Sequence, residues 1–186
     1  MNIVEPIRSR EVLNKFREEL KKRNYRDYVI AEVGFLTGLR ISDILLLKVK
    51  DIMEHSHIII KEKKTGKHKR FPISKKLRGI IEEYIRDKEL KDEDYLFPSR
   101  KSTGKNPYVR REQVFKSLNE VAKAIGIKDA IGTHTLRKTF GYYHYQQFHD
   151  IAVLQEIFNH SAPSITLKYI GINDDIIEQQ MQDFDL

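Results

Sequence analysis

Cysteine is absent from this 186-residue chain. Its absence excludes disulfide bonds, a thiolate nucleophile and zinc sites built from cysteine. No apolar run approaches the ~20 residues that span a bilayer, and the first residues lack the apolar core of a secretion signal. We therefore expect a cytoplasmic protein without a membrane partner. Internal repeats and low-complexity linkers are also absent, and the length favours one domain with a substantial core.

Basic side chains outnumber acidic ones, with 34 Lys and Arg against 27 Asp and Glu, and the formal net charge is +7. This excess favours an anionic partner, with nucleic acid first and an acidic membrane surface second. Many ordinary proteins share the same balance, so the charge by itself shifts the choice only modestly. The motifs of the chain must therefore decide between these classes.

Apolar residues recur at helical spacing along most of the chain, and they predict a mainly helical fold. Gly38 can end the second helix, and Ser42 can cap a short helix that follows it. Thr133 is a fair N-cap for a later helix. Further helices are expected over residues 11–23, 28–36, 74–88, 110–125 and 175–184.

Residues 51–73 differ from these segments because they hold a β-branched run, Ile58 to Ile60, and a second stretch that can be extended. Gly66 lies between the two stretches and predicts a hairpin or a small three-stranded antiparallel sheet. The expected fold class is therefore α+β, mainly helical with this small sheet. The turn is rich in lysine. Such a charge run is often only a solvated face, although a strand turn can also carry a lysine into a DNA groove.

The hairpin and the loop at residues 99–107, which is rich in Ser, Gly, Lys and Arg, are candidate phosphate contacts. Most contacts from such a basic surface would go to phosphates rather than to base edges. These residues therefore predict affinity for DNA more than base specificity. The candidate DNA-binding residues are Lys63, Lys67, Lys69, Arg70, Lys101, Lys105 and Lys138.

The densest group of chemically active side chains lies between residues 133 and 169. His134 and Arg137 are three residues apart, so they share one face of a helix's first turn. The unpaired N–H groups and the positive dipole end of that turn suit a phosphate. His160 and Tyr169 follow later in the stretch. An imidazole, a guanidinium and a phenol around one phosphate would form a transfer site without a metal.

Arg40 lies at a tight junction between two apolar segments, where an unpaired cation would be costly. Asp43, three residues later, supports two interpretations. The arginine is either simply paired with this carboxylate, or held by it and aimed at an anion. Taken one at a time, such features are common, and a lone late histidine is more often a core residue than a catalyst.

Taken together, these residues resemble the catalytic domain of the tyrosine recombinases, the phage-type integrases, over nearly the whole chain from Ser9 onward. Residues 37–43 match the family's first arginine motif, with Arg40 as the arginine and Asp43 as the acidic residue three positions later. Lys64 corresponds to the family's hairpin lysine, at a typical interval after Arg40. The order and the spacing of the motifs agree along the whole chain.

The later motifs extend the resemblance. Residues 134–137 are similar to the H-x-L-R box, residues 154–161 to the segment that holds the second histidine, and Tyr169 falls where the nucleophile is expected. Lys138 stands where the family often has histidine. Asn159 replaces the glycine that commonly precedes the second histidine, which fits a left-handed helix C-cap.

The resemblance implies a site-specific DNA recombinase that uses neither a metal nor another cofactor and forms a 3′-phosphotyrosyl link. Tyr169 would attack, the two arginines would hold the non-bridging oxygens, and Lys64 would protonate the 5′ oxygen. The two histidines would bond the phosphate or carry the phenol proton, with these roles left undivided. The implied catalytic residues are Arg40, Lys64, His134, Arg137, His160 and Tyr169, with Asp43 behind them.

Two alternatives stay open from the residues alone: a type IB topoisomerase-like relaxing enzyme and a DNA-binding regulator that keeps the fold without strand exchange. The family usually carries an N-terminal helical domain that clamps the DNA, and only about eight residues precede the first expected helix here. The expected organisation is an extension at residues 1–8, a catalytic domain at 9–174 and an amphipathic tail helix at 175–186. The tail would join copies in a tetrameric synapse on double-stranded DNA.

Overall fold

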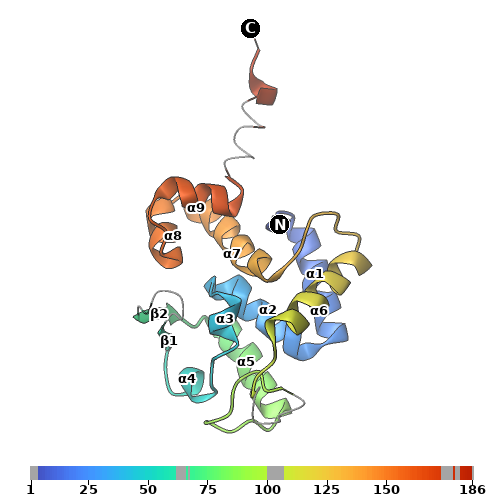
Figure 1. Cartoon of the computed structure of the whole chain (residues 1–186), viewed down its shortest axis with the longest axis vertical. Coiled ribbons are helices and arrows are strands. Elements are labelled where there is room, and N and C mark those ends of the chain that lie inside the picture. Colours follow the sequence, from blue (N-terminus) through green and yellow to red (C-terminus); the bar gives the residue numbers. More distant parts are fainter. Residues whose placement is uncertain are drawn as a thin grey trace.

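A computed structural model describes residues 4–61, 66, 68–99, 107–172, 178 and 181–185, apart from the side chains of Lys61, His68 and Lys69. Helices dominate it, with one small sheet, as predicted (Figure 1). The helices are α1 (Arg10–Arg23), α2 (Tyr25–Thr37), α3 (Ile41–Ile44), α4 (Lys50–Met53), α5 (Lys75–Asp87), α6 (Arg111–Ala124), α7 (Thr133–Phe148), α8 (Ile151–Phe158) and α9 (Pro163–Ile170). None of these helices is both long enough and apolar enough to cross a bilayer.

The helix ends test the predicted caps. Gly38 ends α2 in the left-handed conformation with φ 67°, which confirms its predicted role. Ser42 is not a cap, because it lies inside α3, whose N-cap position belongs to Arg40. Thr133 is the first residue of α7 rather than its N-cap. Gly132 takes the cap position, where its backbone N–H donates to the hydroxyl of Thr135 at 3.1 Å.

The sheet consists of two antiparallel strands, β1 (His57–Lys61) and β2 (His68–Pro72), with Ile58 opposite Phe71. The hairpin prediction is confirmed, but the described residues form no third strand. Lys48 and Tyr95 pair only as an isolated bridge, as do Pro98 and Tyr108. The first bridge cannot lengthen beyond Lys48 because α4 begins at Lys50, and in the second Pro98 has no N–H to donate.

The core is built around α2, which lies in the middle of the molecule and packs on α1, α5, α6 and α7 (Figure 1). This helix is apolar on nearly all sides, as expected for a helix that is surrounded by others. Glu32 of this helix is fully buried, and its carboxylate lies 2.6 Å from Arg17 Nε of α1. The attraction between these two charges offsets part of the cost of burying the carboxylate.

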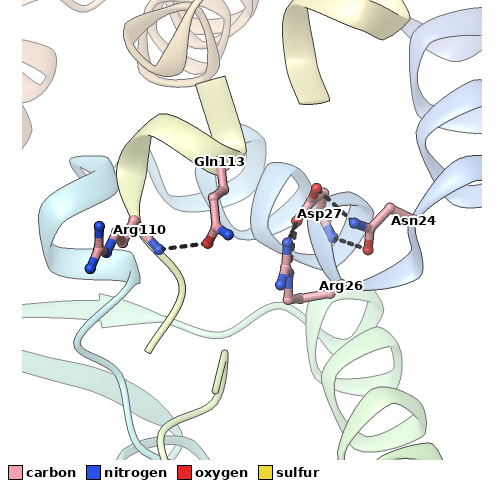
Figure 2. Close-up of polar contacts among 5 residues, drawn as sticks. All are labelled: Asn24, Arg26, Asp27, Arg110 and Gln113. Carbon is pink, nitrogen blue, oxygen red and sulfur yellow. Dashed lines mark hydrogen bonds and ion pairs between the residues drawn. The ribbon is translucent and has the colours of Figure 1, made fainter. Parts of the chain in front are cut away.

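Polar contacts fix the start of α2 (Figure 2). The Asn24 side chain accepts a hydrogen bond from the backbone N–H of Asp27 and donates to its carboxylate at 2.9 Å. Arg26 donates to the same buried carboxylate at 2.8 Å. At the start of α6 the backbone N–H of Arg110 donates to Gln113 at 3.2 Å. These bonds satisfy helix-end donors and fix where both helices begin.

Helices α7, α8 and α9 form a second, smaller apolar cluster (Figure 1). Gly141 of α7 is the point of closest approach. A Cβ atom at this position would lie 2.6 Å from Ile170 Cγ2 of α9 and 2.8 Å from the ring of Phe158 of α8. The missing side chain therefore allows all three helices to pack together.

Replacing Gly141 with alanine should destabilise the protein, because the added methyl group overlaps two buried side chains. Overpacking of this kind costs about 1–3 kcal/mol of unfolding free energy, measurable by urea denaturation. Gly79→Ala is the matched control, since Gly79 lies within α5 and its Cβ would meet open space. That change should stabilise by roughly 0.5–1 kcal/mol. Equal stability of the two variants would contradict the packing described for Gly141.

Candidate active site

Two arginines meet at one backbone carbonyl. Arg137 of α7 is only 3% exposed, and its guanidinium donates to the carbonyls of Gly38 and of Phe158, the second at 3.0 Å. Arg40 donates to the same Phe158 carbonyl at 3.3 Å. The Arg137 guanidinium also lies 4.2 Å from the centre of the Phe158 ring. The end of α2, the start of α7 and the end of α8 therefore converge on a single point.

The sequence explains why this carbonyl is available. Helix α8 ends at Asn159, which adopts the left-handed conformation with φ 52°, so the predicted C-cap is confirmed. The last turn of a helix has carbonyls without intrahelical partners, and it carries the negative end of the dipole. Both properties favour cations, which is why Arg40 and Arg137 gather at Phe158.

Tyr169 of α9 is surrounded by side chains that can donate or accept a proton. Its hydroxyl is 3.2 Å from His134 Nδ1, and its ring centre is 5.2 Å from that of His160. His160 is held by Thr166, whose hydroxyl is 3.0 Å from its Nδ1 atom. Lys138 Nζ is 5.4 Å from the centre of the Tyr169 ring. A phenol, two imidazoles and an ammonium group thus share one site.

Burial and the surrounding charges set the protonation states of Tyr169 and His134. Burial raises the pKa of Tyr169 above 10.0, although the nearby Arg137 and Arg40 act in the opposite direction. Desolvation lowers the pKa of His134 below 6.5, and Arg111 is the foremost of the surrounding charges that lower it further. At neutral pH the phenol is therefore protonated and the imidazole is neutral. A neutral imidazole can accept the phenol proton.

The structure brings together most of the predicted catalytic residues. They lie on α7, on α9 and at the ends of α2 and α8 (Figure 1). Lys64 falls outside the described residues, and Asp43 is buried in α3 three residues after Arg40. The residues that converge are Arg40, His134, Arg137, His160 and Tyr169.

The predicted DNA contacts are only partly within the described residues. Arg70 is exposed on β2, and Lys69 is described only by its backbone in the same strand. Lys138 is 7% exposed and faces the Tyr169 ring, and its contact with DNA stays a prediction. The packing of α7 against α9 turns this side chain inward. The remaining candidates, Lys63, Lys67, Lys101 and Lys105, lie outside the described residues.

Sequence reasoning missed Arg111, the exposed first residue of α6, whose charge acts on His134. The available signal was a pair of arginines, Arg110 and Arg111, at the predicted start of a helix that follows a basic loop. It missed the Phe158 carbonyl because a backbone acceptor leaves no mark in the side-chain pattern. Among the described residues, no three His, Asp or Glu side chains are grouped as metal ligands.

Comparison with known proteins gives a consistent result. The sequence model of the phage integrase family matches residues 8–175. A probable integrase/recombinase of Bacillus subtilis strain 168, YoeC, is 46% identical over 175 residues, which cover 94% of this chain and 93% of the relative. A tyrosine recombinase of Pseudothermotoga lettingae is 31% identical over 157 residues, which cover 84% of this chain and 53% of the relative. This chain therefore spans about half the length of the second relative.

Solved structures show the same fold. The crystal structure of the XerH site-specific recombinase, bound to palindromic difH substrate in a post-cleavage complex, matches with a TM-score of 0.76. The identity is 22%, and the match covers 98% of this chain and 54% of that one. At this identity the likeness establishes the fold, while the family rests on the sequence matches. The chain belongs to the phage integrase family of tyrosine recombinases.

Proposed function

We propose that this chain catalyses site-specific recombination by cleaving and rejoining double-stranded DNA through a 3′-phosphotyrosyl link at Tyr169. One observation carries the proposal: the Tyr169 hydroxyl lies 3.2 Å from His134 Nδ1, beside two arginines that share the Phe158 carbonyl. A nucleophile, a base and two cations for a phosphate are thereby within reach of one another. The XerH site-specific recombinase structure of the same fold, bound to its palindromic difH substrate, supports double-stranded DNA as the partner.

The cleavage step divides among these groups. The phenol oxygen of Tyr169 forms a bond to phosphorus, and its proton passes to the neutral imidazole of His134. The bond from phosphorus to the 5′ oxygen breaks, and that oxygen takes a proton and leaves as a hydroxyl. Lys64 is the proposed donor of this proton. The reverse reaction, with a 5′ hydroxyl from another strand as the attacking group, rejoins the DNA.

The arginines carry the charge of the transition state. Each guanidinium has five N–H donors in a planar fork, so Arg40 and Arg137 can bond Phe158 on one side and non-bridging oxygens on the other. Removing one such donor from a site of this kind costs ~100-fold or more in rate. The chain's own cations thus supply the charge stabilisation, and the proposal requires neither a metal nor a cofactor.

Further basic side chains would hold the flanking phosphates. Arg70, Arg110 and Arg111 are exposed, and the charge of Arg111 already reaches the site. The predicted lysines of the hairpin and of the loop at residues 99–107 complete the proposed DNA surface. Phosphate contacts of this kind would give affinity and register rather than base specificity.

Assembly on DNA is proposed to use the tail and a groove. The tail's described residues project from the body, and Met181 and Phe184 are 71% and 66% exposed (Figure 1). A cavity of about 980 Å³ lies beside α8, and Phe140, Val153 and Arg70 are among the residues that line it. An acidic amphipathic tail from a second copy fits such a groove. Repeated in a ring, this exchange would build a tetramer.

Tyr169→Phe should abolish covalent attachment to DNA while leaving DNA affinity unchanged, because only the nucleophilic oxygen is lost. The measurement is incubation with a nicked suicide substrate in EDTA, followed by a denaturing gel. Tyr145→Phe, in the last turns of α7, is the matched control and should form the adduct normally. An adduct formed by Tyr169→Phe would refute the nucleophile, and no adduct from the unaltered protein on any cognate site would refute the enzyme.

The reaction products distinguish a recombinase from a topoisomerase-like enzyme and from a DNA-binding regulator. Two labelled duplexes that carry the target site should exchange strands in the presence of the protein. A topoisomerase-like enzyme would instead relax a supercoil without exchanging strands between duplexes. A regulator would bind the site and form no covalent adduct.

The cleavage rate should be constant from pH 8 down to about 6.5, the ordinary histidine value, and fall only below it. The reason is that the lowered pKa of His134 keeps the imidazole neutral, and able to accept a proton, until the solution is more acidic than 6.5. Single-turnover adduct formation across this range is the measurement. In His134→Gln the acid limb should disappear along with most of the rate. An acid limb centred above pH 6.5 and lost in this variant would contradict the assignment.

Phe184→Asp should weaken assembly of the protein on DNA and leave its melting temperature unchanged, because this side chain is exposed in the isolated chain. Val153→Asp should have the same effect, because Val153 lines the groove that would receive the tail of a second copy. Met53→Asp is the control, because Met53 is an apolar residue of α4 that is as exposed as Val153. Native gels with a full target site would report the complexes. Unchanged higher-order complexes in both variants would rule out this mode of assembly.

A further inference from the structure

A short N-terminal segment crosses the helices that carry the proposed base and nucleophile. Residues 4–9, here called the N-terminal strap, run along α7. The backbone N–H of Glu5 donates to the carbonyl of Ala130 at 3.0 Å, and that of the buried Ile7 donates to the Thr139 hydroxyl at 2.9 Å. The Tyr143 hydroxyl donates to the carbonyl of Arg8 at 2.6 Å. The strap is therefore fixed to α7 at Thr139 and Tyr143, and to the segment before α7 at Ala130.

The strap also reaches the far end of α9. Arg8 donates to the Glu5 carboxylate from both Nη atoms, at 3.2 Å each. A Cβ atom added to Gly171 would lie 2.6 Å from Arg8 Nη2 and 3.7 Å from Glu5 Oε2. The pair is thus packed directly on Gly171, the left-handed C-cap of α9 with φ 79°. A cation at this end is favoured by the helix dipole and by the free carbonyls of the last turn.

The position of this contact is what connects it to the site. Gly171 follows Tyr169 by two residues, and α9 has only eight residues. A helix this short is marginal by itself, so tertiary contacts must hold its last turn in place. Ile170 packs on Gly141 of α7, Tyr169 packs on the Phe158 ring of α8, and the Glu5–Arg8 pair packs on Gly171. A shift of that turn would move the phenol away from His134.

We infer that Arg8, supported by Glu5, is a positioning residue that locks the C-terminal end of α9 and so keeps Tyr169 against His134. The inference rests on the proposed function for its kinetic consequence. Arg8 acts through the helix end: its side-chain contacts with described residues are to Glu5, the Tyr142 ring and Gly171, not to Tyr169 or His134. A misplacement of about 1 Å can cost ~100-fold in rate, so even a small shift of α9 should be measurable.

The test compares Arg8→Ala with Arg10→Ala. Arg10, the first residue of α1, is a matched control. Its guanidinium lies 5.0 Å from the centre of the Tyr143 ring, and the atoms nearest to Gly171 belong to Arg8 and Glu5 rather than to Arg10. Arg8→Ala should lower the single-turnover rate of adduct formation by ~10-fold or more, with DNA affinity and melting temperature close to those of the control. Arg8→Lys keeps the charge without the fork, and it should fall between the two.

A spectroscopic measurement without DNA separates positioning from general support of the fold. In NMR spectra of the imidazole nitrogens, the His134 Nδ1 signal of Arg8→Ala should move toward its position in Tyr169→Phe, because both variants lose the phenol contact. Arg10→Ala should leave the signal in place. An unmoved signal in Arg8→Ala, or a cleavage rate equal to that of Arg10→Ala, would overturn the inference. If the unaltered protein forms no adduct, the proposed function fails, and the NMR comparison still decides the role of Arg8.

Discussion

Arg40 and Arg137 both donate to the carbonyl of Phe158, and the rest of the site depends on this shared acceptor. The carbonyl exists as a free acceptor because α8 stops at a left-handed asparagine, Asn159, one residue later. Two guanidinium groups this close would repel one another in an apolar setting. The negative end of α8 and the aromatic face of Phe158 offset that repulsion before any phosphate is bound.

The second constraint is the packing of α9. Its tyrosine must reach the histidine of α7, and the two helices can approach closely only because Gly141 has no side chain. Burial then raises the pKa of Tyr169 and desolvation lowers that of His134. The pair is therefore a neutral phenol beside a neutral imidazole, which is the protonation state a proton transfer requires at its start. Packing and electrostatics thus both favour the proposed proton transfer.

Much of this could be predicted from sequence because the signals were local. Gly38 was correctly predicted as a helix end from its residue type, and Asn159 as a left-handed cap because the resembling family commonly has glycine there. The hairpin followed from a β-branched run and a turn glycine. The spacing of the motifs was enough to predict the family. The convergence of distant elements was expected from that resemblance, and the geometry agrees for the residues that the structure describes.

The features that the sequence did not predict depend on contacts between elements far apart in the chain. Ser42 is a good cap by type, but the chain enters α3 at Arg40, whose side chain reaches toward α8. Sequence also did not predict that Lys138 faces the Tyr169 ring, because that contact depends on how α7 packs against α9. The predicted third strand is absent from the described residues, where the pairs Lys48–Tyr95 and Pro98–Tyr108 form only isolated bridges. The Phe158 carbonyl and the strap contact at Gly171 depend on backbone atoms, which composition and periodicity do not report.

The central claim is that Tyr169 becomes covalently joined to a 3′ phosphate of DNA. Mass spectrometry of the trapped adduct, after digestion with a protease and a nuclease, tests it most directly. The account predicts a nucleotide attached through its 3′ phosphate to the peptide that contains Tyr169, with a free 5′ hydroxyl on the other DNA product. A nucleotide found on any other peptide, or a link through a 5′ phosphate, would contradict it.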